Sequence, residues 1–126
     1  MTLLLLVLSL LTTPAMAQTQ AEMNEASCAQ VQTANKTLAR VYQQVLNRHK
    51  GDATATRAIK QSQAAWQAFR AAQLNAIYPE TDKSNYGTVY GMCHCMESAA
   101  LIQQRIKQLS AWIKPREGDV CAGSRS

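Results

Sequence analysis

The sequence predicts an all-α fold, a three-helix antiparallel bundle whose helices run up, down and up. Three long stretches carry apolar residues at steps of three and four, the spacing of one face of an α-helix. Helix-breaking residues, Gly51, Pro79 and Pro115, stand where these stretches end. The sequence shows no strand-like alternation and no internal repeat. Because each connection is short compared with the helices that it joins, consecutive helices are expected to pack antiparallel.

The first predicted helix covers residues 21–50, which contain neither proline nor glycine. Thr19 and Glu22 have the spacing of a capping box at its start. Gly51 suits the position just past its last turn. Its amphipathic stripe consists of Cys28, Val31, Asn35, Leu38, Tyr42, Val45 and His49, and Val41 and Leu46 widen it.

The second helix is predicted to begin after Asp52 or Thr54, either of which can cap it. It should end near Ile77, because the residue before Pro79 avoids the α conformation. The many small residues in its stripe predict close packing against its neighbours. This expected stripe consists of Ala55, Ala58, Ile59, Ala65, Trp66, Phe69, Ala72 and Ala76.

The third helix is predicted to run from about Thr88 to about Ile113, and Pro115 prevents its continuation. Its apolar residues have the same helical spacing as those of the first helix. This stripe consists of Met92, Cys95, Ala99, Ile102, Ile106, Leu109 and Ile113.

The chain is expected to consist of three segments. Residues 1–17 combine an apolar run with a small-residue site, which is typical of a signal peptide cleaved before Gln18. The apolar run is too short to span a bilayer. Residues 18–113 would form the helical domain, and residues 114–126 a polar tail. The mature protein is therefore expected to be periplasmic or secreted and not to span a membrane.

The formal net charge of +5 raises the question of a nucleic-acid partner. The basic residues are scattered along the chain, with no dense Lys/Arg tract and few aromatic residues among them. We interpret them as the solvated surface of the helices and expect no nucleic-acid partner.

Four cysteines in an exported chain allow two disulfides. In an up-down-up bundle the first and third helices begin at the same end, so Cys28 should lie near Cys93 and Cys95. Residues two apart on a helix point about 200° apart. Since Cys95 lies on the apolar stripe, the pair Cys28–Cys95 is favoured over Cys28–Cys93. An extended tail could just bring Cys121 back to the outward cysteine, Cys93, so no free thiol is expected.

The segment GMCHCM, with His94 between two cysteines, also raises the possibility of a metal site or a redox pair. Zinc ligands are usually spaced by two or more residues, and redox pairs by two residues. The tighter C-H-C spacing fits neither pattern. We therefore favour structural disulfides, expect no metal or other cofactor, and expect His94 to be a surface residue.

Gln63, Trp66 and Arg70 share one face of the second helix. Arg70 could lie over an aromatic ring or present itself to a ligand. The alternative, which we favour for Arg70 and for Arg105, is an arginine that snorkels beside a tryptophan at the edge of the core. No set of residues suited to acid–base or nucleophilic catalysis is visible, so no enzymatic activity is expected.

The segment YPETDKSNYG joins the second and third helices and is long for a connection in a helical bundle. It carries two acidic and two aromatic side chains that suit protein recognition. A solvated connector is the alternative interpretation. The candidate partner-binding residues are Tyr78, Glu80, Asp82 and Tyr86.

Five segments stand in a diagnostic order along residues 19–112: QTQAEMNEASCA, LARVY, QAAWQAFRAA, YGTVYGM and QQRIKQL. In these segments the chain resembles the LprI-type lysozyme-inhibitor family of small exported bacterial helical proteins. The most specific matches are Gln63, Ala65, Trp66, Phe69, Arg70, Gly87, Thr88, Arg105 and Leu109.

The chain also departs from the family pattern. Ala39 replaces the asparagine of the family's L-N-x-x-Y, and Ala71 replaces a common aspartate. Leu74 and Glu97 stand where members often carry cysteines, so the resemblance implies a rewired disulfide pattern.

The resemblance implies a protein partner, a lysozyme, whose substrate cleft this protein would occlude. The net charge opposes this, because animal lysozymes are typically cationic as well. The acids of the loop could nevertheless dock locally. A periplasmic envelope scaffold or adaptor without lysozyme activity is the alternative.

Overall fold

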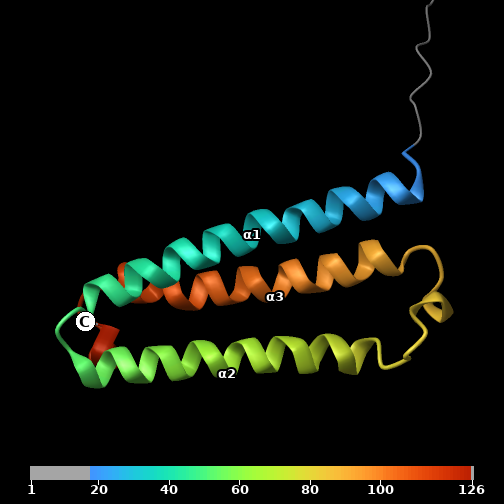
Figure 1. Ribbon diagram of the computed structural model, residues 1–126. Coiled ribbons are helices and arrows are strands. Elements are labelled where there is room, and N and C mark those ends of the chain that lie inside the picture. Colours follow the sequence, from blue (N-terminus) through green and yellow to red (C-terminus); the bar gives the residue numbers. More distant parts are fainter. Residues whose placement is uncertain (1–17, 126) are drawn as a thin grey trace, which may run out of the picture.

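Three long helices account for most of residues 18–125, the part of the chain that the computed structural model describes. They are α1 (Gln20–Arg48), α2 (Ala53–Ile77) and α3 (Tyr90–Ile113), as Figure 1 shows. Two short 3₁₀ helices, η1 (Lys83–Tyr86) and η2 (Gly123–Arg125), lie in the loop and in the tail. The up-down-up antiparallel bundle is confirmed. The expected signal peptide, residues 1–17, lies outside the described residues.

The first two helices begin where the sequence predicted. The Thr19 hydroxyl accepts a hydrogen bond from the Glu22 amide at 3.2 Å, and the Thr19 amide donates to Glu22 Oε2 at 2.8 Å, which completes the capping box. Of the two candidate caps for α2, Asp52 is the one used, because its Oδ1 accepts from the Ala55 amide at 2.9 Å. Gly51 turns the chain between the helices with a φ of 99°, which favours glycine.

The core lies mainly between α1 and α3, which run in the same direction. The Asn24 side chain joins their first turns, since it accepts from the Met92 amide at 3.0 Å and donates to the Thr88 carbonyl at 3.1 Å. At the other end, Arg48 donates to the Ile113 carbonyl at 3.0 Å. The buried core residues are Ala34, Leu38, Val41, Val45, Ala55, Ile59, Ile102 and Leu109.

Gly91 permits the close approach of α3 to α1. A Cβ atom at this position would lie only 3.0 Å from Asn24 Nδ2. The Asn24 side chain would then have to move, although it makes both hydrogen bonds between the first turns. Glycine at this point of α3 therefore leaves room for the Asn24 side chain in its present position.

Helix α2 packs much less closely on α3 than α1 does (Figure 1). It buries only Ala55, Ile59 and Gln63. The predicted stripe is therefore wrong in part: Phe69 is 52% exposed, and four alanines of that stripe are exposed, namely Ala58, Ala65, Ala72 and Ala76.

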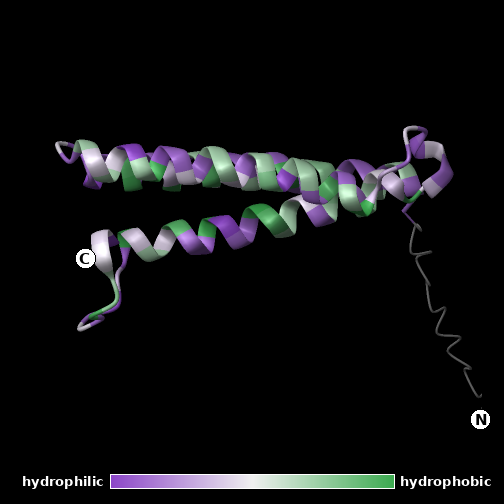
Figure 2. Ribbon diagram, turned by 90° about the horizontal axis from the view of Figure 1, so that it is seen from below, coloured by the Kyte–Doolittle hydropathy of each residue, from purple (hydrophilic) through white to green (hydrophobic). Residues whose placement is uncertain are grey.

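The physical reason is that large polar side chains, not alanines, fill the space between α2 and its neighbours. The inward face of α2 runs through Gln63, Trp66 and Arg70, whose side chains reach α1 or α3. The predicted close packing through small residues does not occur. Each helix carries hydrophobic and hydrophilic residues along its length (Figure 2). Within residues 18–125, no helix combines the length and apolarity that crossing a membrane requires.

A disulfide joins Cys28 of α1 to Cys95 of α3, with their Cα atoms 5.0 Å apart. This confirms the favoured pairing. The expected second bridge is wrong, because Cys93 and Cys121 are free thiols. The tail folds against the other end of the bundle, where the Ser124 carbonyl lies 2.8 Å from His49 Nε2. Cys93 stands near the start of α3, about 30 Å along the helix axis from its last residue.

Candidate functional site

Trp66 lies between two arginines in the space that separates α2 from α3. The guanidinium carbons of Arg70 and Arg105 each lie 5.9 Å from the centre of its indole ring. This distance is within the range of a cation–π interaction. The tryptophan lies at the edge of the core, as predicted, and both arginines lie over its ring. The prediction that Arg105 snorkels to solvent is wrong, because this side chain is buried.

Arg105 is a buried cation whose hydrogen-bond acceptors are all neutral. It is 8% exposed and donates from Nε to Gln63 Oε1 at 2.9 Å. Its two other nitrogens donate to Gln108 Oε1 at 3.2 Å and to Ser62 Oγ at 3.1 Å. Burial lowers the pKa of Arg105, and nearby Tyr42 opposes this only in part. The guanidinium therefore holds α2 to α3 without a counterion among the described residues.

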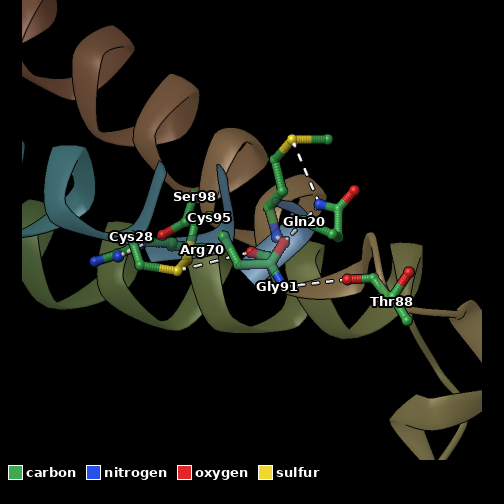
Figure 3. Close-up of a disulfide and its surroundings, with 9 residues drawn as sticks. Gln20, Cys28, Arg70, Thr88, Gly91, Cys95 and Ser98 are labelled. Atoms are coloured by element: carbon green, nitrogen blue, oxygen red, sulfur yellow. Dashed lines mark hydrogen bonds between the residues drawn. A yellow bond between two sulfur atoms is a disulfide. The ribbon is translucent and has the colours of Figure 1, made fainter. Parts of the chain in front are cut away.

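Arg70 ties α2 to both of the other helices. It donates to Ser98 Oγ of α3 at 2.7 Å and to Asn35 Oδ1 of α1 at 3.3 Å. Figure 3 shows Arg70 and Ser98 beside the Cys28–Cys95 disulfide. Burial lowers the pKa of Arg70 as well. Gln63, Trp66, Arg70 and Arg105 thus form one polar network between the helices, and this arrangement favours a structural role for them.

Four aromatic rings gather where α2 meets the loop and the start of α3. The Tyr78 ring lies 5.2 Å from the rings of Tyr86 and Tyr90, in edge-to-face arrangements. Tyr86 also stacks on Tyr90 at 5.8 Å. Burial, followed by the effects of Cys93 and Glu97, raises the pKa of Tyr78. The predicted loop residues Tyr78 and Tyr86 are therefore partly packed and hold the loop in place.

His94 is part of this cluster, so the expectation of a surface residue is wrong. It is half-buried, and its ring lies 5.9 Å from Tyr78 and 5.4 Å from Tyr90. Burial lowers its pKa, and the positive charges of Lys83 and Arg70 lower it further. This contact could not be predicted from the sequence, because it depends on where the loop places the tyrosines.

The loop backbone is fixed by its own side chains. The Glu80 amide donates to the Tyr86 hydroxyl at 2.9 Å, and Lys83 Nζ donates to the Tyr78 carbonyl. Asp82 Oδ1 accepts from the amide and the hydroxyl of Ser84 at 3.0 and 2.7 Å. These two hydrogen bonds lower the pKa of Asp82. Glu80 and Asp82 are therefore both exposed and held on an ordered loop.

The family-motif residues Gly87 and Thr88 lie in the connection between η1 and α3. Gly87 has a φ of 75°, in the left-handed region that favours glycine. The Thr88 carbonyl accepts from Asn24 of α1. These two residues set the direction in which the chain enters α3. They therefore position the loop, whose exposed acids are Glu80 and Asp82.

Three further acids lie at the loop end of the molecule, and sequence reasoning missed their grouping. Glu22 and Glu25 stand on the first turns of α1 and Glu97 on the first half of α3, all exposed. The predicted topology could have revealed this grouping, because an up-down-up bundle places these parts of α1 and α3 at the same end as the 78–87 loop. We call residues 18–34 and 65–101 the loop half; it holds five acids against two basic residues, a net charge of −3.

Although the basic residues are scattered along the sequence, the fold gathers most of them in the opposite half of the bundle. We call residues 35–64 and 102–125 the turn half, because it contains the turn between α1 and α2. It holds eleven basic residues against three acids, a net charge of +8. The molecule is therefore an electrostatic dipole along its helix axes.

The described residues offer no metal site, and the hollow beside the Trp66 network is small; larger hollows of about 470–560 Å³ lie open on the surface. Cys95 is committed to the disulfide. Within residues 18–125 no three His, Cys, Asp or Glu side chains come together as metal ligands would. A cavity of about 140 Å³ lies between α2 and α3, which is below the usual size of ligand pockets. Its lining consists of Ala58, Ile59, Ser62, Arg105, Leu109 and Trp112.

Comparison with known proteins assigns the fold and the motif to one family. The family described as "Lysozyme inhibitor LprI" matches residues 12–109, most of the chain. No curated protein and no solved structure matches this chain. The match includes all three helices up to Leu109, the Trp66 network and the acidic loop. The chain therefore belongs to the LprI lysozyme-inhibitor family.

Proposed function

We propose that this protein binds a lysozyme through its loop half and blocks the enzyme's substrate cleft. The observation that carries the proposal is the local negative charge around the 78–87 loop, in a chain whose net charge is positive. Family membership points to a lysozyme as the partner. This protein and animal lysozymes both carry a positive net charge, which would oppose binding. The separation of charge removes this difficulty, because association depends on the charges of the two surfaces that meet.

The construction of the loop suits it to binding a protein. Its backbone is held by Asp82, Tyr86 and Lys83, so little conformational freedom remains to be lost on association. Tyrosine is enriched at protein interfaces, and the Tyr86 ring is only half-buried. Exposed carboxylates steer a cationic partner toward this end. A rigid protrusion with acids and tyrosines could fill a cleft that normally binds a polysaccharide.

We also propose that the protein acts after export, in the periplasm or outside the cell, as the mature segment 18–126. The Cys28–Cys95 disulfide supports an oxidising compartment. In this proposal residues 1–17 are removed as a signal peptide, residues 18–113 form the inhibitory domain and residues 114–126 are an appended tail.

The test is lysozyme turnover of peptidoglycan with and without the oxidised mature protein. Glu80→Lys should raise the inhibition constant about tenfold, since charged pairs at interfaces contribute on the order of 1–2 kcal/mol. Glu117→Lys makes the same charge change in the turn half and is the matched control, because Glu117 is also exposed. It should inhibit as well as wild type.

Two outcomes would contradict parts of the proposal. If a large excess of wild-type protein leaves the turnover of animal and bacterial lysozymes unchanged, a periplasmic envelope scaffold or adaptor becomes the better assignment. If the protein inhibits and Glu80→Lys inhibits equally well, the family activity stands and the loop is not the binding surface.

A further inference from the structure

The turn half carries many exposed positive side chains, on several faces of the bundle, that the lysozyme-binding proposal does not use. Nine of its eleven basic side chains are exposed to solvent. They come from α1, the following turn, α2, α3 and the tail, so the fold brings together residues that are far apart in the sequence. The nine are Lys36, Arg40, Arg48, Lys50, Arg57, Lys60, Lys107, Lys114 and Arg116.

The acids of the turn half do little to neutralise this surface. Asp52 caps α2, and Asp119 accepts from the Cys121 amide at 2.9 Å. Throughout residues 18–125 none of these nine cations lies within ion-pairing distance of a carboxylate. The positive field is therefore available to an external anionic partner.

An apolar side chain lies next to this surface. Val120 is 98% exposed and stands in the tail between Arg116 and Arg125. The tail leaves the end of α3 and folds back on the bundle, at the end opposite the 78–87 loop (Figure 2). Basic side chains beside an exposed apolar residue are typical of segments that lie at a bilayer surface, where the apolar residue enters the headgroup region.

We propose that the turn half is a docking surface for a bilayer rich in anionic phospholipid, with Val120 entering the interface. Phosphate headgroups would neutralise the basic side chains, and the acidic loop half would face away from the membrane. The first helix alone is 29 residues long, so the two ends lie on the order of 40 Å apart. This separation is several Debye lengths at physiological salt, so each end can bind its own partner. The inference rests on the charge distribution and does not depend on lysozyme inhibition.

The test is cosedimentation of the oxidised mature protein with vesicles that contain phosphatidylglycerol, compared with vesicles of phosphatidylcholine alone. Binding is expected only to the anionic vesicles and should weaken as salt is raised. The triple variant Lys50→Gln, Arg57→Gln, Lys60→Gln should reduce the partition coefficient on the order of 100-fold, since each basic residue contributes about a fivefold factor. All three positions are exposed, so the variant should keep its helical circular dichroism.

Two further variants complete the test. Glu22→Gln, Glu25→Gln, Glu97→Gln removes three charges from the loop half and should bind vesicles at least as well as wild type. Val120→Ser should reduce binding severalfold without changing the net charge. Lysozyme inhibition measured without vesicles should be unaffected by the Lys50/Arg57/Lys60 variant at physiological salt, so failure of either proposal can be recognised separately.

Three results would overturn the inference. The first is equal binding to the two kinds of vesicle, and the second is unchanged binding by the Lys50/Arg57/Lys60 variant. The third is binding to duplex DNA as tight as to anionic vesicles with no effect of Val120→Ser, which would indicate a general polyanion surface.

Discussion

At the scale of single residues, the side chains that matter most are polar or half-buried. Trp66 contacts two cations that have no carboxylate partner among the described residues. Its ring face supplies negative electrostatic potential, and neutral oxygens accept the hydrogen bonds. Such a network fixes the spacing of α2 from α3 more specifically than alanine packing would, because each donor needs its own acceptor.

Removal of the Trp66 ring should therefore destabilise the protein far more than removal of the Phe69 ring. Trp66→Ala is expected to lower the free energy of unfolding by about 2–4 kcal/mol, through lost packing and two lost cation–π contacts. Phe69→Ala should cost less than about 1 kcal/mol, because that ring is 52% exposed. Urea unfolding followed by circular dichroism measures both. Equal losses would mean that Phe69 is covered in solution.

The pKa of His49 should lie above the ordinary value for histidine, and the pKa of His94 should lie below it. His49 Nδ1 and Nε2 lie 2.8 Å from the carbonyl oxygens of Val45 and Ser124. Both nitrogens can donate only in the protonated ring, so these bonds raise the pKa of His49, with a smaller contribution from Asp52. Burial, Lys83 and Arg70 lower the pKa of His94. NMR titration of the imidazole protons separates them, and nearly equal midpoints for the two histidines would contradict these contacts.

The same shifts define how each histidine affects stability. The folded protein holds the His49 proton more tightly than the unfolded chain, so this contribution is complete below pH 6.5 and is lost as pH rises through the folded pKa. For His94 the folded state binds the proton less tightly, so its contribution is complete above pH 6.5 and is lost as pH falls through the folded pKa. Changing His49 to Gln should remove the first dependence and leave the second.

At the scale of the helices, the sequence predicted α1 and α3 well because both have a long helical apolar pattern, although α3 also buries Ser98 and Arg105. It also predicted the Cys28–Cys95 pair, since the helical period and the topology together determine which cysteine faces α1. The inward face of α2 was predicted poorly, because apolar periodicity cannot detect an interface made by Gln63, Trp66 and Arg70. Prediction of the acidic end would have required the tertiary arrangement, which places Glu22 and Glu97 in the same half of the bundle as the loop.

The disulfide should be the strongest single link between α1 and α3. It closes a sequence separation of 67 residues, so the variant Cys28→Ser, Cys95→Ser should lose about 4 kcal/mol of stability in the chain-entropy description. The matched control, Cys93→Ser with Cys121→Ser, removes the two free thiols and should change stability little. Thermal unfolding of both variants checks this. A comparable loss in the control would show that Cys93 and Cys121 pair in solution.

Helix α2 should open before the other two helices. Its second half, residues 67–77, buries no side chain and is held mainly by Arg70, whereas α1 and α3 share the core and the disulfide. Native-state hydrogen exchange should therefore be fastest, among helical amides away from the helix ends, in residues 70–77. Arg70→Gln should accelerate exchange there more than in α3. Uniform protection across the three helices would contradict this account of the packing.

At the scale of the whole molecule, a net charge of +5 conceals two surfaces of opposite sign. Parallel α1 and α3 place Glu22, Glu25 and Glu97 in the half of the bundle that holds the loop, while the half that holds Gly51 carries most of the basic residues. Stability does not demand such a separation, since opposite charges mixed along the helices would favour salt bridges. The separation allows one end to attract a cationic partner while the other end repels it.

This repulsion leads to a prediction about salt and association. At about 0.01 M salt the Debye length is about 30 Å, so the turn half should slow the approach of a cationic lysozyme to the loop. The Lys50/Arg57/Lys60→Gln variant should then associate faster than wild type. At about 0.15 M salt the Debye length is about 8 Å, and the two on-rates should converge.

Glu80→Lys lies at the contact itself, so it should associate more slowly at both salt concentrations. Stopped-flow or surface-based kinetics measures these rates. If Glu80→Lys and the Lys50/Arg57/Lys60 variant respond to salt in the same way, net charge and not its distribution governs association.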